Sequence, residues 1–249
     1  MGCMISIVIP LYNEQYRIEN TLRRIQEYFS NVDFNYELIF VNDGSTDETN
    51  MIITKFKNNF DINPIRGNNC HILILNNEVN MGKGFSVRKG ILASKGKYIL
   101  FTDADLSTDI SEEQKLFDYL KNGYDIVIAS RGLKDSKLIE RQNILRQSMG
   151  KFFNFLVKLI LNLDYKDTQC GFKYFSRYAI DKIFPYLEIN DFSFDVEILY
   201  LAKKLGLKVK EVPVSWINSK NSKVRILKDS FKMIISLIKI RRMYSDFKV

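Results

Sequence analysis

The stretch Tyr98-Ile99-Leu100-Phe101-Thr102-Asp103-Ala104-Asp105 decides the fold class of this chain. Its first five residues form an apolar run typical of a buried strand, and two carboxylates follow, two residues apart. Side chains alternate along an extended backbone, so Asp103 and Asp105 point the same way. Mg²⁺ and Mn²⁺ prefer oxygen ligands, and Mg²⁺ is usually held by one or two carboxylates together with substrate phosphates. The spacing therefore predicts a divalent metal and a nucleotide diphosphate; two solvated loop carboxylates are the alternative.

Three further apolar runs end in polar residues in the same way. The runs and the polar segments after them are residues 5–9 with 10–14, 37–41 with 42–47, and 72–75 with 80–84. The second segment ends in Asp43-Gly44-Ser45-Thr46-Asp47, in which a glycine turn precedes a Ser or Thr helix cap. In an open parallel α/β sheet, ligands bind at the carboxyl ends of the strands. The four strands therefore predict one ligand site at a shared edge of the sheet.

Strand and helix patterns alternate through residue 129, which predicts an α/β fold with a mostly parallel central sheet flanked by helices. The chain after residue 129 should cover this sheet. With 249 residues, 46% of them hydrophobic, and no evident linker, residues 1–249 are expected to form a single domain. The expected strands span residues 5–10, 36–42, 71–75, 97–103, 124–129, 171–176 and 207–213, and the expected helices span 14–30, 46–60, 83–94, 111–122, 140–163, 177–187, 193–205 and 223–243.

The polar segments carry a family resemblance. Residues 10–14, the Asp43 to Asp47 turn, Asn80-Met81-Gly82-Lys83-Gly84 and Asp103-Ala104-Asp105 together resemble the family 2, inverting glycosyltransferases of the Rossmann-like GT-A fold. In the second half, Asp167-Thr168-Gln169-Cys170-Gly171-Phe172-Lys173, with residues 194–199 and 210–216, is similar to dolichyl-phosphate β-glucosyltransferases. The resemblance implies a hexosyltransferase that moves glucose from UDP-glucose onto a polyprenyl (dolichyl) phosphate. Residues 1–130 would hold the nucleotide sugar and residues 131–222 the acceptor.

Other functions stay open at this point. A polyprenyl-phosphate mannosyltransferase using GDP-mannose shares the first half of the pattern, and a family 2 transferase could instead act on a soluble or polysaccharide acceptor. Fold and site do not select the sugar. The intact Asp103-Ala104-Asp105 and Asp43 argue against a non-catalytic basic module that keeps only the fold. A Ser/His/Asp hydrolase is disfavoured because His71 is the only histidine and no Gly-x-Ser-x-Gly motif occurs.

The resemblance implies which residues bind the donor. Asn13, Glu14 and Asp43 match the family positions that hold uracil and ribose, although Asp43 could instead cap the next helix. Asp105, with Asp103 nearby, would hold Mg²⁺ or Mn²⁺, which stabilises the charge of the departing UDP. Lys83, between two glycines, would approach the nucleotide or pyrophosphate. The full set predicted for the nucleotide sugar is Pro10, Asn13, Glu14, Asp43, Lys83, Asp103 and Ala104.

A phosphate acceptor changes what the site needs. A phosphate monoester is mostly a dianion at neutral pH because its second pKa is about 6, so cations matter more than a base. Asp167 matches the family position nearest the reacting centre, where it would position the acceptor or the sugar hydroxyls, or act as a base for a hydroxyl acceptor. Asp195 and Glu197 either complete the site or cap a helix. The predicted catalytic residues are Asp167, Asp105 and Arg131, and the predicted phosphate ligands are Arg131, Lys173 and Arg225, with Arg141 and Arg146 as weaker candidates.

The carboxyl-terminal region concentrates positive charge. The chain has a formal net charge of +8, from 37 basic and 29 acidic residues, and residues 220–248 hold nine basic residues against Asp229 and Asp246. Leu227, Phe231, Ile234 and Ile238 follow helical spacing, which predicts a basic amphipathic helix within residues 223–249. Such a helix can lie on an anionic membrane surface, or pack on the domain with a solvated outer face. Nucleic acid is not an expected partner, because no recognised binding motif accompanies the charge.

Membrane attachment is expected to be peripheral. No window reaches the roughly 20 apolar residues that a spanning helix needs, and the nearest, residues 152–163, contains Asn154 and Lys158. Three cysteines, Cys3, Cys70 and Cys170, are an odd number without metal-ligand spacing, which favours reduced intracellular thiols. The sequence therefore predicts a cytoplasmic protein on the cytoplasmic face of a membrane.

Overall fold

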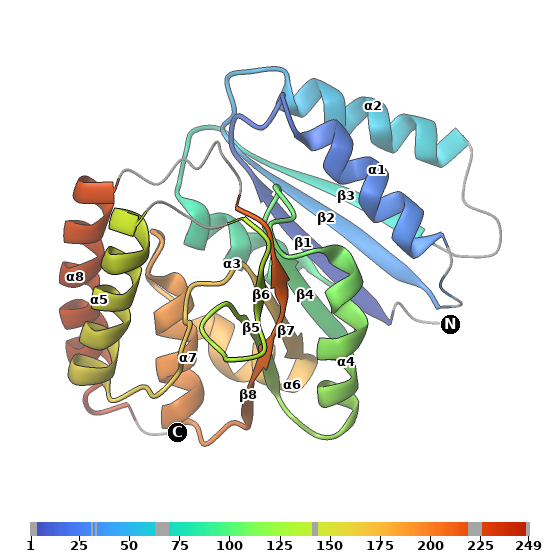
Figure 1. Cartoon of the computed structure of the whole chain (residues 1–249). Coiled ribbons are helices and arrows are strands. Elements are labelled where there is room, and N and C mark those ends of the chain that lie inside the picture. Colours follow the sequence, from blue (N-terminus) through green and yellow to red (C-terminus); the bar gives the residue numbers. More distant parts are fainter. Residues whose placement is uncertain are drawn as a thin grey trace.

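The computed structural model describes residues 4–30, 32, 34–62, 70–140, 144–218 and 226–247. Its main sheet has seven strands in the order β3-β2-β1-β4-β7-β5-β8 (Figure 1). A second pair is formed by β6 (Lys137–Leu138) and β9 (Ser215–Trp216). The strands of the main sheet are β1 (Ile5–Leu11), β2 (Tyr36–Asp43), β3 (Cys70–Asn77), β4 (Tyr98–Thr102), β5 (Ile126–Ser130), β7 (Phe172–Ser176) and β8 (Val209–Pro213).

The sheet is mostly parallel, as the sequence predicts. β1 runs parallel to β2 and β4, β2 parallel to β3, and β5 parallel to β8. β7 is antiparallel to both of its neighbours, β4 and β5. The chain after residue 129 was expected to cover the sheet, but two of the strands predicted in it, at 171–176 and 207–213, enter the sheet as β7 and β8. As a result, β7 leads away from the edge at which β4 delivers Asp103.

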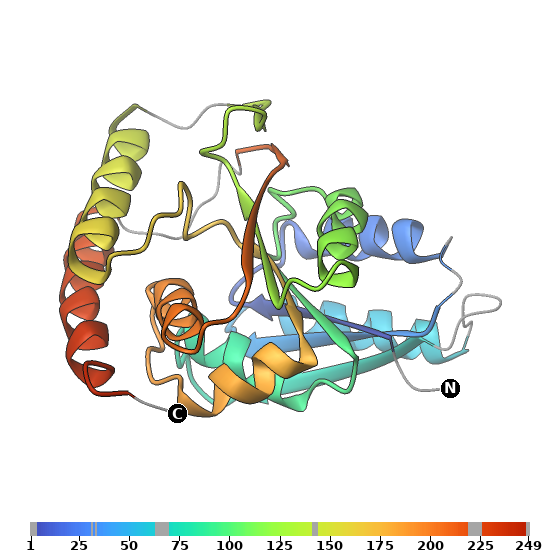
Figure 2. The same cartoon turned by 90° about the horizontal axis from the view of Figure 1, so that it is seen from below.

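Helices cover both faces of the sheet, so its strands are apolar on both sides. One face carries α1 (Ile18–Phe29), α2 (Thr49–Ile62) and α4 (Glu113–Lys121), and the other carries α3 (Lys83–Ala93), α6 (Arg177–Ile183) and α7 (Phe194–Lys204) (Figures 1 and 2). Successive side chains of β1 divide between the two cores: Ile7 and Ile9 pack with α1, and Val8 packs with α3. Short 3₁₀ turns occur at Ile110–Glu112 and Phe184–Tyr186.

Two long helices, α5 (Ile144–Leu161) and α8 (Ile226–Met243), lie side by side beyond α7 (Figures 1 and 2). Phe153 and Val157 of α5 and Leu237 and Ile240 of α8 belong to the same buried cluster as α7. The carboxyl-terminal helix predicted from the sequence is therefore present, and one of its faces packs on the domain. No helix in the described part of the chain has both the length and the apolarity to cross a membrane.

The first two helices begin later than their sequence patterns predict. The backbone N–H of Asn13 donates to Ser45 Oγ (2.9 Å), and that of Glu14 donates to Thr49 Oγ1 (2.7 Å). Asn13 has a φ of 52°, a left-handed conformation that asparagine tolerates better than most residues. The loop after β1 is thus tied to the loop after β2. This places the polar segments of both strands together at the carboxyl edge of the sheet.

Candidate active site

The two carboxylates after β4 each lie beside a cation. Asp103 Oδ1 is 2.7 Å from Lys83 Nζ, and Asp105 Oδ2 is 3.8 Å from Arg17 Nη1. Asp105 also accepts from the backbone N–H of Ser107 (3.0 Å). The first turn of α3 thus contributes Lys83, and the segment before α1 contributes Arg17. The structure brings Lys83, Asp103 and Asp105 together, as the sequence predicts.

Gly171 gives the Asp103 carboxylate its space. A Cβ atom on Gly171 would lie 2.0 Å from Asp103 Oδ2 and 2.3 Å from its Cγ, far inside van der Waals contact. The Asp103 N–H donates to the Gly171 carbonyl at 3.0 Å. The segment from Asp167 to Lys173 therefore passes directly behind the Asp-X-Asp motif, so motifs from the two halves of the sequence form one site.

Burial and neighbouring charges shift the pKa values of Asp103 and Lys83. Burial raises the pKa of Asp103; the Lys83 charge opposes this effect and the neighbouring Asp105 charge adds to it. Burial alone would lower the pKa of Lys83, but the charges of Asp103 and Asp195 outweigh it and raise that pKa. Among the described residues, no group of three or more His, Cys, Asp and Glu side chains converges. A metal at Asp103 and Asp105 would thus take its remaining ligands from water and substrate, as Mg²⁺ commonly does.

Arg17 is a site residue that the sequence analysis missed. Its guanidinium forms an ion pair with Glu14, in which Nη2 donates to Glu14 Oε1 at 2.8 Å, and Nη1 faces Asp105. Burial opposes the charge of Arg17, yet the hydrogen bond and charge of Glu14 raise its pKa. The acid–base spacing of three residues at the start of α1 is the signal that could have identified it.

Asp43 faces inward in this structure. Its Oδ1 accepts from Asn77 Nδ2 and from Met81 N, both at 2.8 Å, and its Oδ2 accepts from Gly82 N at 3.0 Å. The carboxylate therefore shapes the turn that leads to Lys83. The alternative that it caps α2 does not fit these contacts, because Asp47 accepts from Thr49 N (3.0 Å) at that helix start. Its contact with ribose or uracil stays a prediction.

The remaining residues predicted for the donor line the same edge. Asn13 Oδ1 accepts from Thr46 N at 2.8 Å, across the two loops. Ala104 is buried, and its carbonyl accepts from Thr21 Oγ1 at 2.5 Å. Pro10 lies in β1 opposite Val41. These contacts hold the edge in shape.

Arg131 and Asp167 bind each other through two side-chain hydrogen bonds. Arg131 Nε lies 2.6 Å from Asp167 Oδ2, and Nη2 lies 2.8 Å from Oδ1. Burial would raise the pKa of Asp167, but the Arg131 charge and its hydrogen bonds outweigh this and hold the pKa below its usual value. The Arg131 guanidinium also lies over the Trp216 ring, 5.4 Å from the centroid. Asp167 is thus a paired anion.

The prediction that Lys173 binds the acceptor phosphate does not fit its environment. Lys173 is 0% exposed, its Nζ is 2.6 Å from Asp195 Oδ1, and it donates to the Cys170 carbonyl at 2.7 Å. The sequence motif shows the lysine but not the depth of β7 or its carboxylate partner on α7. Lys173 and Asp195 therefore form a buried structural ion pair beneath the site.

Glu197 acts on a loop that borders the site. It accepts from the backbone N–H groups of Glu188 and Ile189, both at 3.0 Å, and neither caps α7 nor reaches the Asp-X-Asp motif through a described contact. The 188–193 loop that it holds reaches the start of α3, where the Asn190 carbonyl accepts from Gly84 N at 2.8 Å. The Phe192 ring of this loop lies 6.0 Å from Lys83 Nζ. The loop forms a wall of the site that the sequence analysis did not identify.

Three of the predicted phosphate ligands are not placed by the structure. Arg141 and Arg225 lie outside the described residues, and the side chain of Arg146 on α5 is also outside them. Cys170 is a buried free thiol, and burial raises its pKa to about 11. It is therefore a packed neighbour of the site and not a nucleophile.

Comparison with known proteins places the chain in a family. Residues 6–184 match the family model "Glycosyl transferase family 2". The dolichyl-phosphate beta-glucosyltransferases of Dictyostelium discoideum and Saccharomyces cerevisiae are each 36% identical to this chain. Each alignment covers 96% of this chain, together with 74% of the first protein and 75% of the second. The Homo sapiens protein of the same name is 31% identical over 88% of this chain and 69% of its own length.

Solved structures show the same fold at lower identity. Glucosyl-3-phosphoglycerate synthase from Mycobacterium tuberculosis, in complex with Mn²⁺, UDP-glucose and glycerol 3-phosphate, aligns with a TM-score of 0.69 at 18% identity. The alignment covers 99% of this chain and 82% of that one. The family match extends over most of the chain and includes the motifs at the sheet edge. This chain therefore belongs to glycosyl transferase family 2.

Proposed function

We propose that this enzyme transfers glucose from UDP-glucose to dolichyl phosphate, with inversion at the anomeric carbon. The relatives that share 31–36% identity with it carry the name dolichyl-phosphate beta-glucosyltransferase. The observation that carries the acceptor class is the ion pair between Arg131 and Asp167. It leaves the site without a free carboxylate base at Asp167, which a sugar-hydroxyl acceptor would require and a phosphate would not.

The donor diphosphate fits the edge formed by Asp103 and Asp105. The two carboxylates would hold Mg²⁺ or Mn²⁺, which supplies Lewis-acid stabilisation of the departing UDP when bound. Lys83 and Arg17, each next to one of these carboxylates, bring positive charge to the place where the leaving group gains negative charge. With this arrangement, the leaving oxygen needs no proton donor.

The acceptor phosphate supplies its own nucleophile. At neutral pH it is mostly a dianion, and one of its oxygens attacks the anomeric carbon while the bond from that carbon to the UDP oxygen breaks. The electron pair leaves with UDP, so no proton transfer is needed. The Asp167 pair uses Nε and Nη2 of Arg131, and Nη1 is the nitrogen that would donate to the acceptor phosphate.

The lipid acceptor requires work at a bilayer surface. We place the enzyme peripherally on the cytoplasmic face of a membrane, because its proposed acceptor is a lipid and its carboxyl-terminal region is basic. An anionic membrane would attract that charge.

A substrate screen tests the proposal. The purified chain is incubated with UDP-glucose, UDP-N-acetylglucosamine or GDP-mannose, each with a short-chain polyprenyl phosphate and with Mg²⁺, Mn²⁺ or chelator. We expect product only from UDP-glucose with a divalent metal, and β linkage in the product by NMR. Mannosyl product from GDP-mannose would reassign the donor. Transfer to a free sugar hydroxyl but not to the lipid phosphate would reassign the acceptor.

A further inference from the structure

The outward faces of α5 and α8 carry exposed apolar side chains beside basic ones. Phe152, Phe155 and Leu159 on α5 are 58%, 59% and 66% exposed, and Ile235 and Ile238 on α8 are 53% and 44% exposed. On α5 these residues recur at helical spacing opposite the buried side chains, so they form one stripe that faces away from the core. Exposed apolar stripes of this kind mark interaction surfaces.

Basic residues far outnumber acidic ones on the two helices. The α5 sequence contains no acidic residue, and the α8 sequence contains only Asp229. The basic residues of the two helices whose side chains the structure describes are Lys151, Lys158, Lys232, Lys239, Arg241 and Arg242, of which Lys158 pairs with Asp164. A surface that combines exposed aromatic rings with this charge is complementary to lipid headgroups that carry phosphate and to the apolar layer below them.

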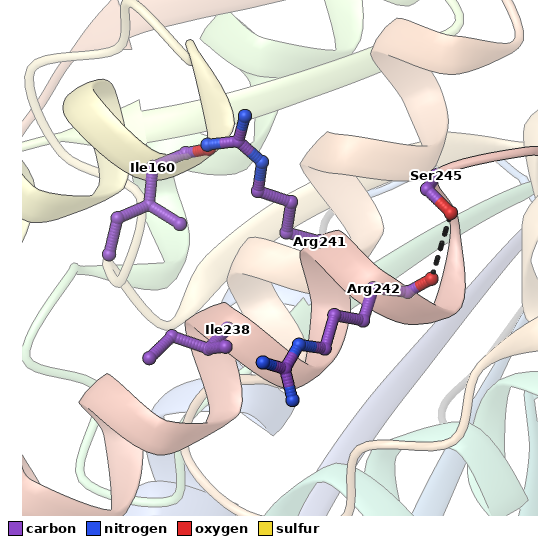
Figure 3. Close-up of a pocket in the computed structure, with 5 residues that line it drawn as sticks. All are labelled: Ile160, Ile238, Arg241, Arg242 and Ser245. Atoms are coloured by element: carbon purple, nitrogen blue, oxygen red, sulfur yellow. Dashed lines mark hydrogen bonds between the residues drawn. The ribbon is translucent and has the colours of Figure 1, made fainter.

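A groove joins the two helices near their carboxyl ends. It has a volume of about 540 Å³ and is lined by Ile160, Ile238, Arg241, Arg242 and Ser245 (Figure 3). Arg241 reaches from α8 toward α5, where its Nη1 donates to the Ile160 carbonyl at 2.9 Å (Figure 3). Arg242 is exposed, and its backbone carbonyl accepts a hydrogen bond from Ser245 Oγ. Two guanidinium groups beside two isoleucines match the chemistry of a lipid phosphate and its first acyl carbons.

The same face is connected to the candidate site. Ser236 Oγ of α8 donates to Asp191 Oδ2 of the 188–193 loop at 2.9 Å. Tyr244 OH donates to Glu197 Oε1 at 2.8 Å, and the other oxygen of that carboxylate accepts from Ile189 N. The helix that presents Ile235 and Ile238 outward therefore also holds the loop that borders Lys83.

We propose that the outer face of α5 and α8 is a docking surface for an anionic bilayer. Phe152, Phe155 and Leu159 enter the headgroup region, and the groove at Arg241 and Arg242 takes a lipid phosphate. This inference rests on the proposed function, because the lipid acceptor is what requires the enzyme to bind a bilayer. The basic carboxyl-terminal helix alone would be attracted to the membrane by its charge. The proposed surface also includes α5, whose exposed apolar side chains contribute by burial in the bilayer.

Vesicle sedimentation tests the surface with the full chain. The vesicles are phosphatidylcholine, alone or mixed with phosphatidylserine, and contain no polyprenyl phosphate. The variant Phe152→Ser/Phe155→Ser should lose about tenfold or more in partitioning to both kinds of vesicle, since the buried apolar area drives insertion. Arg241→Gln/Arg242→Gln should lose most of the preference for anionic vesicles, and so should the wild type in high salt.

Matched variants outside α5 and α8 serve as controls. Met51→Ser/Leu92→Ser removes two exposed apolar side chains from α2 and α3, and Lys55→Gln/Lys95→Gln removes two exposed charges. Both should bind vesicles like the wild type. Thermal melting of every variant checks that the fold is kept. If the control pairs lose as much binding as the α5 and α8 pairs, the docking surface is wrong.

A fluorescent probe reports the depth of the face. Phe155→Trp should be quenched by lipids brominated on the acyl chains, while Met51→Trp should not, relative to the background of the single native Trp216. Vesicle binding that survives Phe152→Ser/Phe155→Ser at low and high salt would overturn the proposal. A concentration-dependent dimer that this variant abolishes, without vesicle binding, would assign the face to a second copy of the chain. Vesicle binding without transfer to any polyprenyl phosphate would instead reject the proposed function and keep the surface.

Discussion

Arg131 and Asp167 are locked together by paired hydrogen bonds of 2.6 and 2.8 Å, with the pKa of the carboxyl held below its usual value. A carboxylate in this state is a weak base, because it has little tendency to accept a proton at neutral pH. The pair therefore fits the positioning role predicted for Asp167 better than the role of a general base. The proposed chemistry then depends on the ionisation of the acceptor and not on that of the enzyme.

The pH dependence of transfer should follow the acceptor. We expect kcat/KM for a polyprenyl phosphate to rise with pH around the second pKa of the phosphate, about 6, and then to level off. Initial rates measured from acidic to alkaline pH give the pH at which kcat/KM rises. With a phosphonate analogue, whose second pKa is higher, the rise of kcat/KM should move to higher pH by the difference between the two second pKa values. A rise that stays at the same pH for both acceptors would indicate a titrating group on the enzyme.

The same ion pair should make stability depend on pH in one direction. Folding lowers the pKa of Asp167. The ion pair therefore contributes fully to the free energy of unfolding above the pKa of the unfolded state, about 3.9, and this contribution is lost as the pH falls through the pKa of the folded state. We expect Asp167→Asn to cost about 2 kcal/mol at pH 7, a value reduced from that of a fully buried pair because Arg131 is partly exposed. Urea unfolding of the wild type and of Asp167→Asn, at pH 7 and below pH 4, measures the cost and its pH dependence. The gap between wild type and variant should narrow in acid, and a gap that widens would contradict the assignment.

The sequence predicted the seven strands of the main sheet, because apolar runs that end in polar residues are local signals, but not the short pair β6 and β9. It did not predict that β7 is antiparallel. The pattern of residues 171–176 indicates a strand but not its direction or neighbours, which depend on pairing with β4 and β5. The Asp-X-Asp motif could be recognised because Asp103 and Asp105 lie only two residues apart in the sequence.

The roles of single side chains depended on partners far away in the sequence. Lys173 was predicted as a phosphate ligand because it follows a motif, but its partner Asp195 comes from α7. Arg17 was missed because its value lies in reaching Asp105 from another element. Burial and long-range pairing are properties of the packed fold, and no local pattern encodes them.

Because Lys173 is paired with Asp195 in the core, its substitution should affect stability and not acceptor binding. Removing one member leaves an uncompensated charge in the core, which costs about 3–5 kcal/mol. We therefore expect Lys173→Met to lower the urea midpoint strongly, without the specific rise in acceptor KM expected of a phosphate ligand. Lys173→Met/Asp195→Leu should recover part of the stability. A normally stable Lys173→Met protein with only a raised acceptor KM would return Lys173 to the acceptor site.

The two carboxylates of the Asp-X-Asp motif should not contribute equally. Asp105→Asn keeps the side-chain shape and removes charge that would hold the metal, so kcat/KM should fall by about a thousandfold, or roughly 4 kcal/mol of transition-state stabilisation. Asp103→Asn should cost less activity. It should also lower the melting temperature, because Lys83 loses its partner at 2.7 Å. Metal-dependent UDP binding by calorimetry separates the two effects. Near-normal turnover of Asp105→Asn in chelated buffer would reject the metal site.

Gly171 offers a way to move Asp103 without changing any charge. A methyl group on Gly171 would meet the whole carboxylate, at 2.0 Å from Oδ2 and 2.7 Å from Oδ1, so the carboxylate must turn away from its place beside Lys83. Gly171 does not have a positive φ, so alanine meets no backbone penalty there. We expect Gly171→Ala to weaken metal-dependent UDP binding by about 10- to 100-fold, the range typical for disturbed support of a metal ligand.

Gly150→Ala is the matched control for this substitution. Gly150 lies in α5, and a Cβ atom there would find nothing within 4 Å. The change should stabilise the protein by up to about 1 kcal/mol through helix propensity and leave UDP binding as it was. Chemical denaturation and metal-dependent UDP titration on the two variants make the comparison. If Gly171→Ala binds UDP and metal like Gly150→Ala, the Asp103 carboxylate is free to move without loss, and its orientation against Gly171 does not matter for the metal site.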